Sequence, residues 1–286
     1  MRLYPAIPAL LLAACATGPT APPATLGADP FYTQYEDAAG LPVLASSRVD
    51  PRALDLTAGI VAAMTRHRPD LRAELVRQDY RLSVLAEDEQ LLDLPEFASW
   101  TRPARDDPRL TRCELIHYDT RIGALTDREY WNARVRGIGG QRTVVAEEDV
   151  LGRNTSRYYG ETIAVHEFAH NILYAIQAAD PALYARIEAA YANALADGLW
   201  LNEYAVTTLH EYWAEGTQFW FDSNRLVVVD GRRILNHPDL AAYDPALYAV
   251  LGEAYGPDHE LPGDPFHLSP ARVPPGPIPE NTAEVC

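Results

Sequence analysis

Apolar side chains recur at helical spacing along residues 159–175, which read YGETIAVHEFAHNILYA. The apolar positions are Ile163, Val165, Phe168, Ala169, Ile172 and Leu173. Apolar surface with this period predicts a helix that lies in the interior or lines a cleft. Gly160, just before the run, marks the expected start of that helix.

Similar patterns predict the other elements. Aspartate followed by proline, at residues 50–51 and 180–181, is typical of a capped helix start. The patterns place helices at residues 51–66, 69–78, 181–197, 205–221 and 245–255, and strands at 80–86 and 142–146. Residues 94–127 are charged and irregular, and we assign no element to them.

The N-terminal end has the pattern of an export signal. Residues 1–15 contain one arginine, an apolar segment and a final Leu-Ala-Ala-Cys that resembles a bacterial lipobox, whose cysteine is lipidated. We therefore expect a lipoprotein signal peptide at 1–15 with lipid on Cys15; an ordinary cleaved signal is the alternative. Residues 16–30 are rich in proline, alanine, glycine and threonine, which predicts a flexible tether.

Length and composition set limits on the rest. Residues 31–286 are enough for one domain with a real core, with an N-terminal lobe at 31–127, a catalytic core at 128–255 and a proline-rich tail at 256–286. A hydrophobic content of 48% indicates a globular chain. The formal net charge of −16 argues against nucleic acid as a partner, because phosphate binding needs a basic surface.

The sequence HEFAH places candidate metal ligands on the first predicted helix. His166 and His170 are four residues apart, so their Cβ atoms would lie about 5–6 Å apart on one face and both imidazoles could bind one zinc ion. Glu167 points about 100° away, and its carboxylate could act as a general base on zinc-activated water. The alternative is a chance occurrence of the motif in a chain with eight histidines.

Two histidines need at least one more protein ligand, and two known arrangements do not fit. The metzincin pattern requires a further histidine six residues after His170, where Ile176 stands. The thermolysin-like pattern could start at Glu203, but Thr207 stands where that pattern has aspartate. The remaining route runs through residues 209–221, LHEYWAEGTQFWF.

In that segment two glutamates lie four residues apart among aromatic side chains. We expect Glu211 to bind the ion and Glu215 to accept a hydrogen bond from a ligating imidazole, which fixes the ring orientation. An exposed acidic face is the alternative for this pair. His210, directly before Glu211, is a rival ligand.

These motifs together resemble the anthrax lethal factor type of gluzincin metalloprotease and its bacterial and fungal relatives. The resemblance covers residues 159–224 and consists of HEFAH, Tyr204 and the sequence Glu-Tyr-Trp-Ala-Glu that begins at Glu211. In that family the first glutamate of this sequence is a zinc ligand, and a tyrosine seven positions upstream assists catalysis. The resemblance therefore implies these roles for Glu211 and Tyr204, although the spacer lengths and His210 differ from the family pattern.

Tyr204 can also be considered from its spacing. On one unbroken helix, Tyr204 and Glu211 would share a face about 10 Å apart along the axis. The tyrosine hydroxyl could then stabilise an oxyanion or protonate a leaving amine. A buried core tyrosine with some other hydrogen-bond partner is the alternative.

The three cysteines allow one disulfide. If Cys15 carries lipid, Cys113 and Cys286 are the remaining pair, and a bridge between them would attach the tail to the body. Two free thiols are the alternative.

We therefore expect an α+β, mainly helical, zincin-like metallopeptidase domain with a small mixed sheet. It would hold one zinc ion per chain, act on a peptide or protein, and contact the membrane only through lipid on Cys15, in the bacterial cell envelope outside the cytoplasm. One alternative is a non-catalytic envelope lipoprotein that keeps zinc for stability. Another is a zinc hydrolase that acts on a non-peptide amide in cell-wall material.

Overall fold

A computed structural model describes residues 19–279, 281–284 and 286. The predicted signal peptide and Cys15 lie outside the described residues. None of the helices formed by the described residues has the length and apolar character that crossing a bilayer requires.

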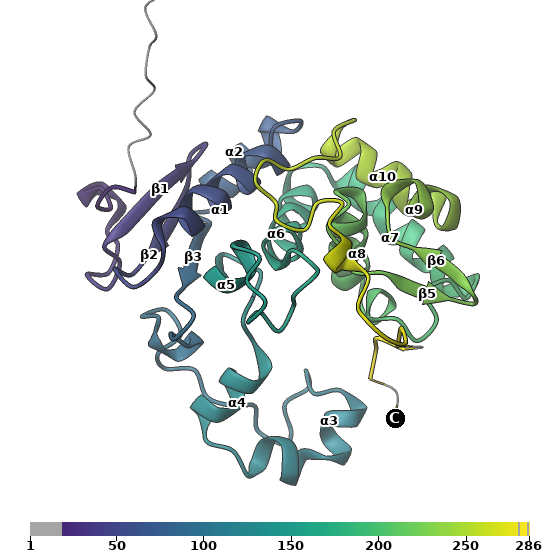
Figure 1. Ribbon diagram of the computed structural model, residues 1–286, viewed down its shortest axis with the longest axis horizontal. Helices are drawn as coiled ribbons and strands as arrows, with labels where there is room; N and C mark the ends of the chain where they lie inside the picture. The colour runs from purple at the N-terminus through teal and green to yellow at the C-terminus, as the bar shows by residue number, and fades with distance from the viewer. Residues whose placement is uncertain (1–18, 280, 285) are drawn as a thin grey trace, which may run out of the picture.

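A four-stranded mixed sheet lies along one side of the fold (Figure 1). Its strands, in spatial order, are β1 (Gln34–Ala38), β2 (Leu41–Ala45), β3 (Arg81–Leu85) and β4 (Arg142–Ala146). β1 is antiparallel to β2, whereas β2, β3 and β4 run parallel to one another. The predictions of strands at residues 80–86 and 142–146 are confirmed by β3 and β4.

Hydrophobic side chains cover both faces of this sheet. Val43 and Val84 enter the main core, whereas the alternate residues Leu44 and Leu85 enter a smaller cluster around Phe97. Because β2 and β3 are covered on both faces, their sequences read as nearly continuous apolar runs.

Helices make up most of the rest of the molecule. They are α1 (Pro51–Met64), α2 (Pro69–Arg77), α5 (Glu147–Val150), α6 (Ile163–Ala179), α7 (Pro181–Ala196), α8 (Leu209–Trp220), α9 (His237–Tyr243) and α10 (Pro245–Tyr255). α1 and α2 lie beside the sheet, and α7 to α10 lie on the opposite side (Figure 1). A small hairpin of β5 (Val227–Val229) and β6 (Arg232–Ile234) follows α8. The fold is therefore α+β and mainly helical with a small mixed sheet, as the sequence predicts.

Two predicted helix starts are confirmed by their hydrogen bonds. The Asp50 side chain accepts a hydrogen bond from the Arg52 N–H, and Asp180 accepts one from the Leu183 N–H, each at 3.0 Å. Each aspartate therefore satisfies a backbone donor that the first helical turn leaves without a partner.

The helix predicted at residues 205–221 begins later than expected. Tyr204–Val206 form a separate 3₁₀ turn, and α8 starts after Thr208, whose hydroxyl accepts a hydrogen bond from the Glu211 N–H at 3.1 Å. The condition under which Tyr204 and Glu211 would share a helix face, one unbroken helix, is therefore not met. Threonine followed three residues later by glutamate is a helix-start signal, and residues 208–211 carry it.

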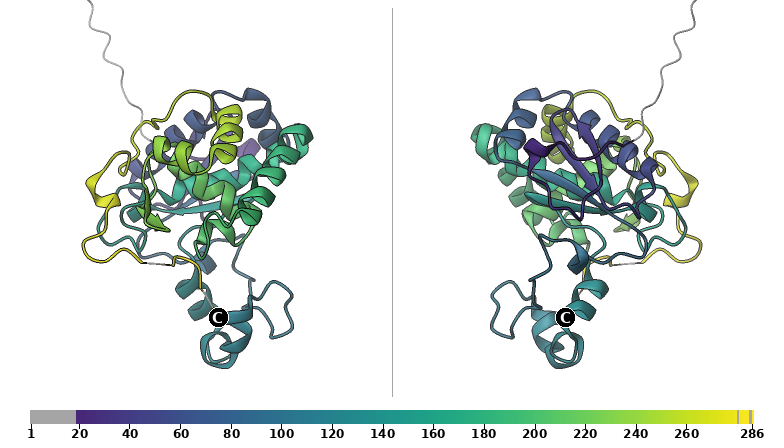
Figure 2. Two further views of the ribbon diagram at one scale, coloured as in Figure 1. Left: turned by 90° about the vertical axis from the view of Figure 1, so that its right-hand side faces the viewer. Right: turned by 90° about the vertical axis from the view of Figure 1, so that its left-hand side faces the viewer.

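The chain between β3 and β4 forms a projection at one end of the molecule (Figure 2). It contains α3 (Arg112–Ile116), a π-helical turn at Asp119–Gly123, and α4 (Asp127–Arg134). Thr111 and Thr126 begin α3 and α4 with reciprocal capping bonds to Glu114 and Glu129. These capping boxes are the local signal in a segment to which we assigned no element.

Both ends of the described chain are attached to the rest of the fold. Thr20, in the predicted tether, exchanges backbone hydrogen bonds of 3.0 and 2.7 Å with Tyr35 of β1. At the other end, the tail descends from the helical half to the projection (Figure 1). There Cys286 forms a disulfide with Cys113 of α3, with the two Cα atoms 5.5 Å apart.

Candidate active site

The helices α6 and α8 pack together in the main core and carry the predicted ligands. Phe168 of α6 and Trp213 of α8 have no exposed surface. The Trp213 indole N–H donates a hydrogen bond to the Ala169 carbonyl of α6 at 3.1 Å. Side chains on the facing surfaces of these helices are therefore held in place by the core.

Three candidate ligands converge where the two helices face each other. His166 Nε2 lies 3.1 Å from Glu211 Oε2, and His170 Nε2 lies 3.8 Å from the same oxygen. One ligand atom from each of the three residues lies within 4.8 Å of the other two. The fold thus brings the distant Glu211 to the paired histidines, as the sequence analysis expected.

This arrangement fits a zinc ion. With zinc–ligand bonds of about 2.0–2.1 Å, the ligand atoms of a tetrahedral site lie roughly 3.3 Å apart, and the two separations from Glu211 bracket that value. Two imidazoles and a carboxylate are also a donor set that zinc accepts. Glu167 and Glu215 line the same cavity, and buried carboxylates are stabilised by a nearby cation or by taking up a proton.

A side chain that the sequence analysis did not identify orients the first histidine. His166 Nδ1 lies 2.9 Å from Gln218 Oε1, whereas the expected partner, Glu215 Oε1, lies 3.5 Å away. Since an amide oxygen only accepts, Gln218 Oε1 holds the proton on Nδ1, and Nε2 is the nitrogen that faces Glu211. Glu215 instead accepts a hydrogen bond from Asn224 Nδ2 at 2.7 Å.

Glu167 lies beside the ligands in a cavity of about 620 Å³. The segment before β4 closes around it: a Cβ atom on Gly137 would lie 2.7 Å from Glu167 Oε1, and one on Gly139 would lie 2.8 Å from the Glu167 carbonyl oxygen. The neighbouring Ile138 exchanges backbone hydrogen bonds with Val144 of β4. Glycine at 137 and 139 therefore lets this backbone approach α6 closely.

The local electrostatics follow from burial and from the crowding of carboxylates. Burial lowers the pKa of His166, but Glu211, Glu167 and Glu215 outweigh it and raise that pKa to about 10. Burial, with the neighbouring His166, lowers the pKa of His170 to about 3. Burial raises the pKa of Glu167 to about 7 and that of Glu215 to about 7.

Tyr204 reaches the open side of this site from the 3₁₀ turn. Its ring centroid lies 6.4 Å from that of His166, and the residue is 43% exposed. The partial burial of its hydroxyl and the nearby Glu211 raise its pKa, so the hydroxyl keeps its proton. Tyr204 therefore lines the cavity as expected, although it is not part of α8.

The rival ligand His210 lies outside the three-residue group, as does Glu203 of the thermolysin-like pattern. The His210 ring lines the cavity and lies tilted beside the Tyr174 ring, with 4.8 Å between centroids. Glu203 is buried and accepts a hydrogen bond from Thr282 Oγ1 at 2.5 Å. Neither belongs to a group of converging ligand atoms among the described residues.

No known protein family matches the chain, and no curated protein matches it. Solved structures similar to it include the PRO-PRO endopeptidase PPEP-2 from Paenibacillus alvei. That likeness has 14% sequence identity and a TM-score of 0.43, and covers 74% of this chain and 96% of that one. The interpretation of the site therefore depends on its own geometry.

Proposed function

We propose that this protein is a zinc-dependent peptidase that hydrolyses peptide bonds by attack of water. The observation that carries the proposal is the convergence of His166, His170 and Glu211 from two core helices beside Glu167. A buried set of ligands next to a free carboxylate, in a cavity open to solvent, is the arrangement that metal-assisted hydrolysis requires.

The ion and the side chains have separate tasks. When bound by His166, His170 and Glu211, zinc supplies a Lewis acid that lowers the pKa of water toward about 7. Glu167 is placed to take a proton from a water molecule in the cavity and later to give it to the leaving amine. Gln218 fixes the orientation of the His166 ring.

Tyr204 has a supporting role on the open side of the cavity. Its hydroxyl keeps its proton and faces the ligands, so it can donate a hydrogen bond to the oxygen that becomes negative as the peptide carbonyl is attacked. The resemblance to lethal factor-type gluzincins implies the same role for this residue.

We also propose that the chain is anchored by lipid on Cys15 and faces outside the cytoplasm in the bacterial envelope. The support is the sequence of residues 1–15 alone. Mass analysis of the mature N-terminal peptide tests this proposal. A diacylated Cys15 is expected, and an unmodified N-terminus at another residue would reject the anchor.

The activity is tested by screening purified, zinc-loaded protein on a peptide library and on cell-wall fragments in parallel. We expect cleavage within peptides and loss of that cleavage when a chelator removes zinc. Cleavage of cell-wall amides alone would show a hydrolase of another substrate class. Retention of zinc with no cleavage in either set would favour a non-catalytic zinc lipoprotein.

A further inference from the structure

The final residues of the chain connect the projection to the turn that carries Tyr204. We call residues 281–284 and 286 the C-terminal strap. Its contacts fall into two groups, one with residues 202–204 and one with α3 and the turn that follows it. The strap therefore joins two parts of the molecule that are far apart in sequence.

The first group of contacts fixes the backbone at Tyr204. The Tyr204 N–H donates a hydrogen bond to Thr282 Oγ1 at 2.7 Å, and the same hydroxyl donates to Glu203 Oε2 at 2.5 Å. One residue further, the Ala283 N–H donates to the Asn202 carbonyl at 3.0 Å. Thr282 thus acts as donor and acceptor at once, which a hydroxyl can do through a single oxygen atom.

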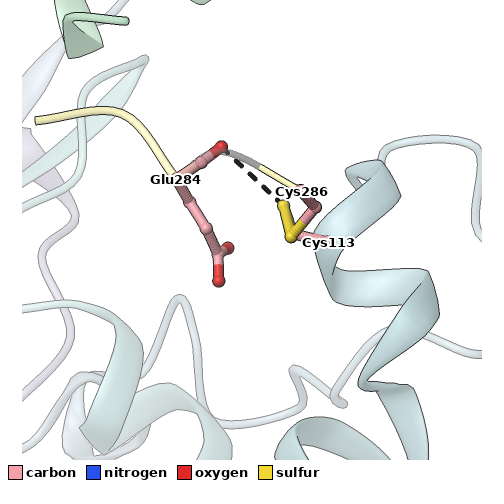
Figure 3. Close-up of side chains that lie close together, drawn as sticks. All are labelled: Cys113, Glu284 and Cys286. Carbon is pink, nitrogen blue, oxygen red and sulfur yellow. Dashed lines mark hydrogen bonds between the residues drawn. A yellow bond between two sulfur atoms is a disulfide. The ribbon is translucent and has the colours of Figure 1, made fainter. Parts of the chain in front are cut away.

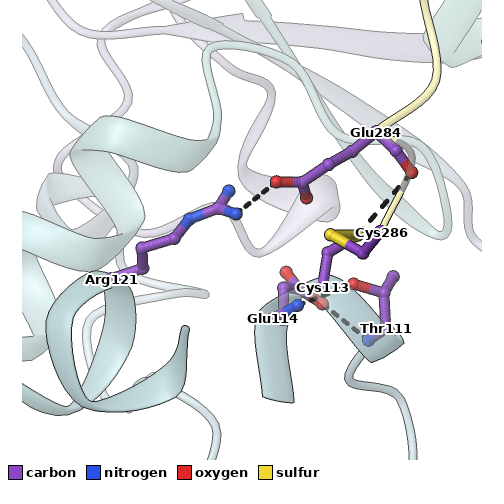
Figure 4. Close-up of a disulfide and its surroundings, with 6 residues drawn as sticks. All are labelled: Thr111, Cys113, Glu114, Arg121, Glu284 and Cys286. Carbon is purple, nitrogen blue, oxygen red and sulfur yellow. Dashed lines mark hydrogen bonds and ion pairs between the residues drawn. A yellow bond between two sulfur atoms is a disulfide. The ribbon is translucent and has the colours of Figure 1, made fainter. Parts of the chain in front are cut away.

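The second group fixes the far end of the strap to the projection. Cys286 forms a disulfide with Cys113 of α3. The Cys113 sulfur lies 3.7 Å from the Glu284 carbonyl oxygen (Figure 3). The Glu284 carboxylate forms an ion pair with Arg121 (Figure 4). Because both sulfur atoms are used in the disulfide, this cluster offers no thiolate to a metal.

The two halves of this turn are held by different contacts. The turn lies between Trp200 and Thr208, the N-cap residue of α8. Trp200 is buried and donates hydrogen bonds to Tyr243 and Asp244. Trp200 and Asn202 both have positive φ, 57° and 63°. Asparagine adopts this conformation readily, whereas for tryptophan it costs free energy and persists only where the surroundings impose it. Tyr204–Val206 form a 3₁₀ turn whose second half is held by the body of the protein, because Ala205 is buried and the Val206 carbonyl accepts a hydrogen bond from the Tyr191 hydroxyl at 2.9 Å. At Tyr204 itself, the strap supplies the hydrogen bond to the backbone N–H.

We propose that the C-terminal strap is a positioning element that holds Tyr204 at the open side of the active site, and that Thr282 and the Cys113–Cys286 disulfide are its two attachment points. The catalytic part of this statement rests on the proposed function. The structural part does not, because the contact between Thr282 and the Tyr204 backbone is independent of any reaction.

The structural part is tested by hydrogen exchange on the full-length, zinc-loaded protein. In Thr282→Val and in the double variant Cys113→Ser/Cys286→Ser, the amides of residues 202–206 should exchange roughly tenfold faster, whereas those of α6 should keep their protection. Thr282→Ser keeps the hydroxyl and should exchange as the parent does. Thr101→Val removes an exposed threonine of the projection and serves as the control. Unchanged exchange at residues 202–206 in both strap variants would overturn the proposal.

The catalytic part is tested on a peptide that the parent cleaves. Both strap variants should keep one zinc per chain and lose about tenfold in kcat, since a displaced catalytic group lowers the rate of the chemical step. In a Tyr204→Phe background, Thr282→Val should cause little further loss, because it acts through that hydroxyl. Equal losses in both backgrounds would exclude positioning of Tyr204. If the parent cleaves no peptide, the proposed function fails, and hydrogen exchange still decides whether the strap holds the turn.

Discussion

The two sides of the active site are held by different means. His166, His170 and Glu211 stand on helices whose other faces are buried in the main core, where Trp213 and Phe168 have no exposed surface. Tyr204 stands on a short turn and is itself 43% exposed, and its backbone N–H is bonded to Thr282 near the chain terminus.

This difference shows how stability and function are distributed in the molecule. A buried helix pair resists local opening because separating it would expose apolar surface, whereas an exposed turn opens at low cost. The ligand side should therefore tolerate loss of the strap, and the Tyr204 side should respond to it. A substitution on one side of the active site should leave the other side unchanged, so the unchanged side serves as an internal reference.

The largest effect is expected on the ligand side without loss of zinc. Glu167→Gln keeps the shape of the side chain but cannot take up a proton, so hydrolysis should fall by roughly 10²–10⁴-fold. Zinc content should stay at that of the parent. Steady-state kinetics and metal analysis of the same preparation check both statements, and an active Glu167→Gln variant would reject Glu167 as the base.

On the opposite side, Tyr204→Phe removes only the hydroxyl. We expect kcat to fall by about 10²-fold, because one donor to the developing negative charge is lost, with zinc content and hydrogen exchange of residues 202–206 unchanged. Kinetics indistinguishable from those of the parent would remove Tyr204 from the mechanism. Only the ligand side of the active site would then have a catalytic role.

The role of Gln218 in orienting the His166 ring is tested by Gln218→Met. This change removes the acceptor at His166 Nδ1 within a fully buried position, and zinc affinity should fall by about 10–100-fold. Gln218→Glu keeps an acceptor there and should retain more of the affinity. Competition with a chromogenic chelator measures it, and equal affinity in all three proteins would show that Gln218 does not orient the ring.

The smallest effect is expected at the glycine beside Glu167. In Gly137→Ala the new Cβ would lie 2.5 Å from Ile163 Cγ2 and 2.7 Å from Glu167 Oε1, so the carboxylate must move. We expect about a tenfold loss in kcat with zinc retained. Gly59→Ala in α1, where the nearest atom is 3.8 Å away, is the matched control. If both variants behaved alike, the close approach at Gly137 would have no catalytic consequence.

Much of the ligand side could be predicted because its signals are local. The spacing of His166 and His170 depends only on the helical period, and the Asp-Pro starts identify α1 and α7 from adjacent residues. Glu211 could be proposed from the family pattern. Gln218 could not, since its contact with His166 depends on how α6 and α8 cross.

The parts that sequence reasoning missed depend on weak or distant signals. β1 and β2 are joined by Ala39 and Gly40, which both have positive φ as a tight hairpin turn requires, but alanine is rarely found there. Pro42 within β2 also argues against a strand. The hydrogen bond between Tyr204 and Thr282 joins residues 78 positions apart, and no local sequence pattern indicates it.

The measurement that tests the central claim most directly is the zinc content of the purified parent and of Glu211→Ala, with exposed Glu188→Ala as the control. We predict one zinc per chain in the parent and in Glu188→Ala, and loss of most of the zinc in Glu211→Ala, because two imidazoles alone hold the ion weakly. Full zinc occupancy in Glu211→Ala would show that the third ligand lies elsewhere. A parent that binds no zinc would contradict the account of this site.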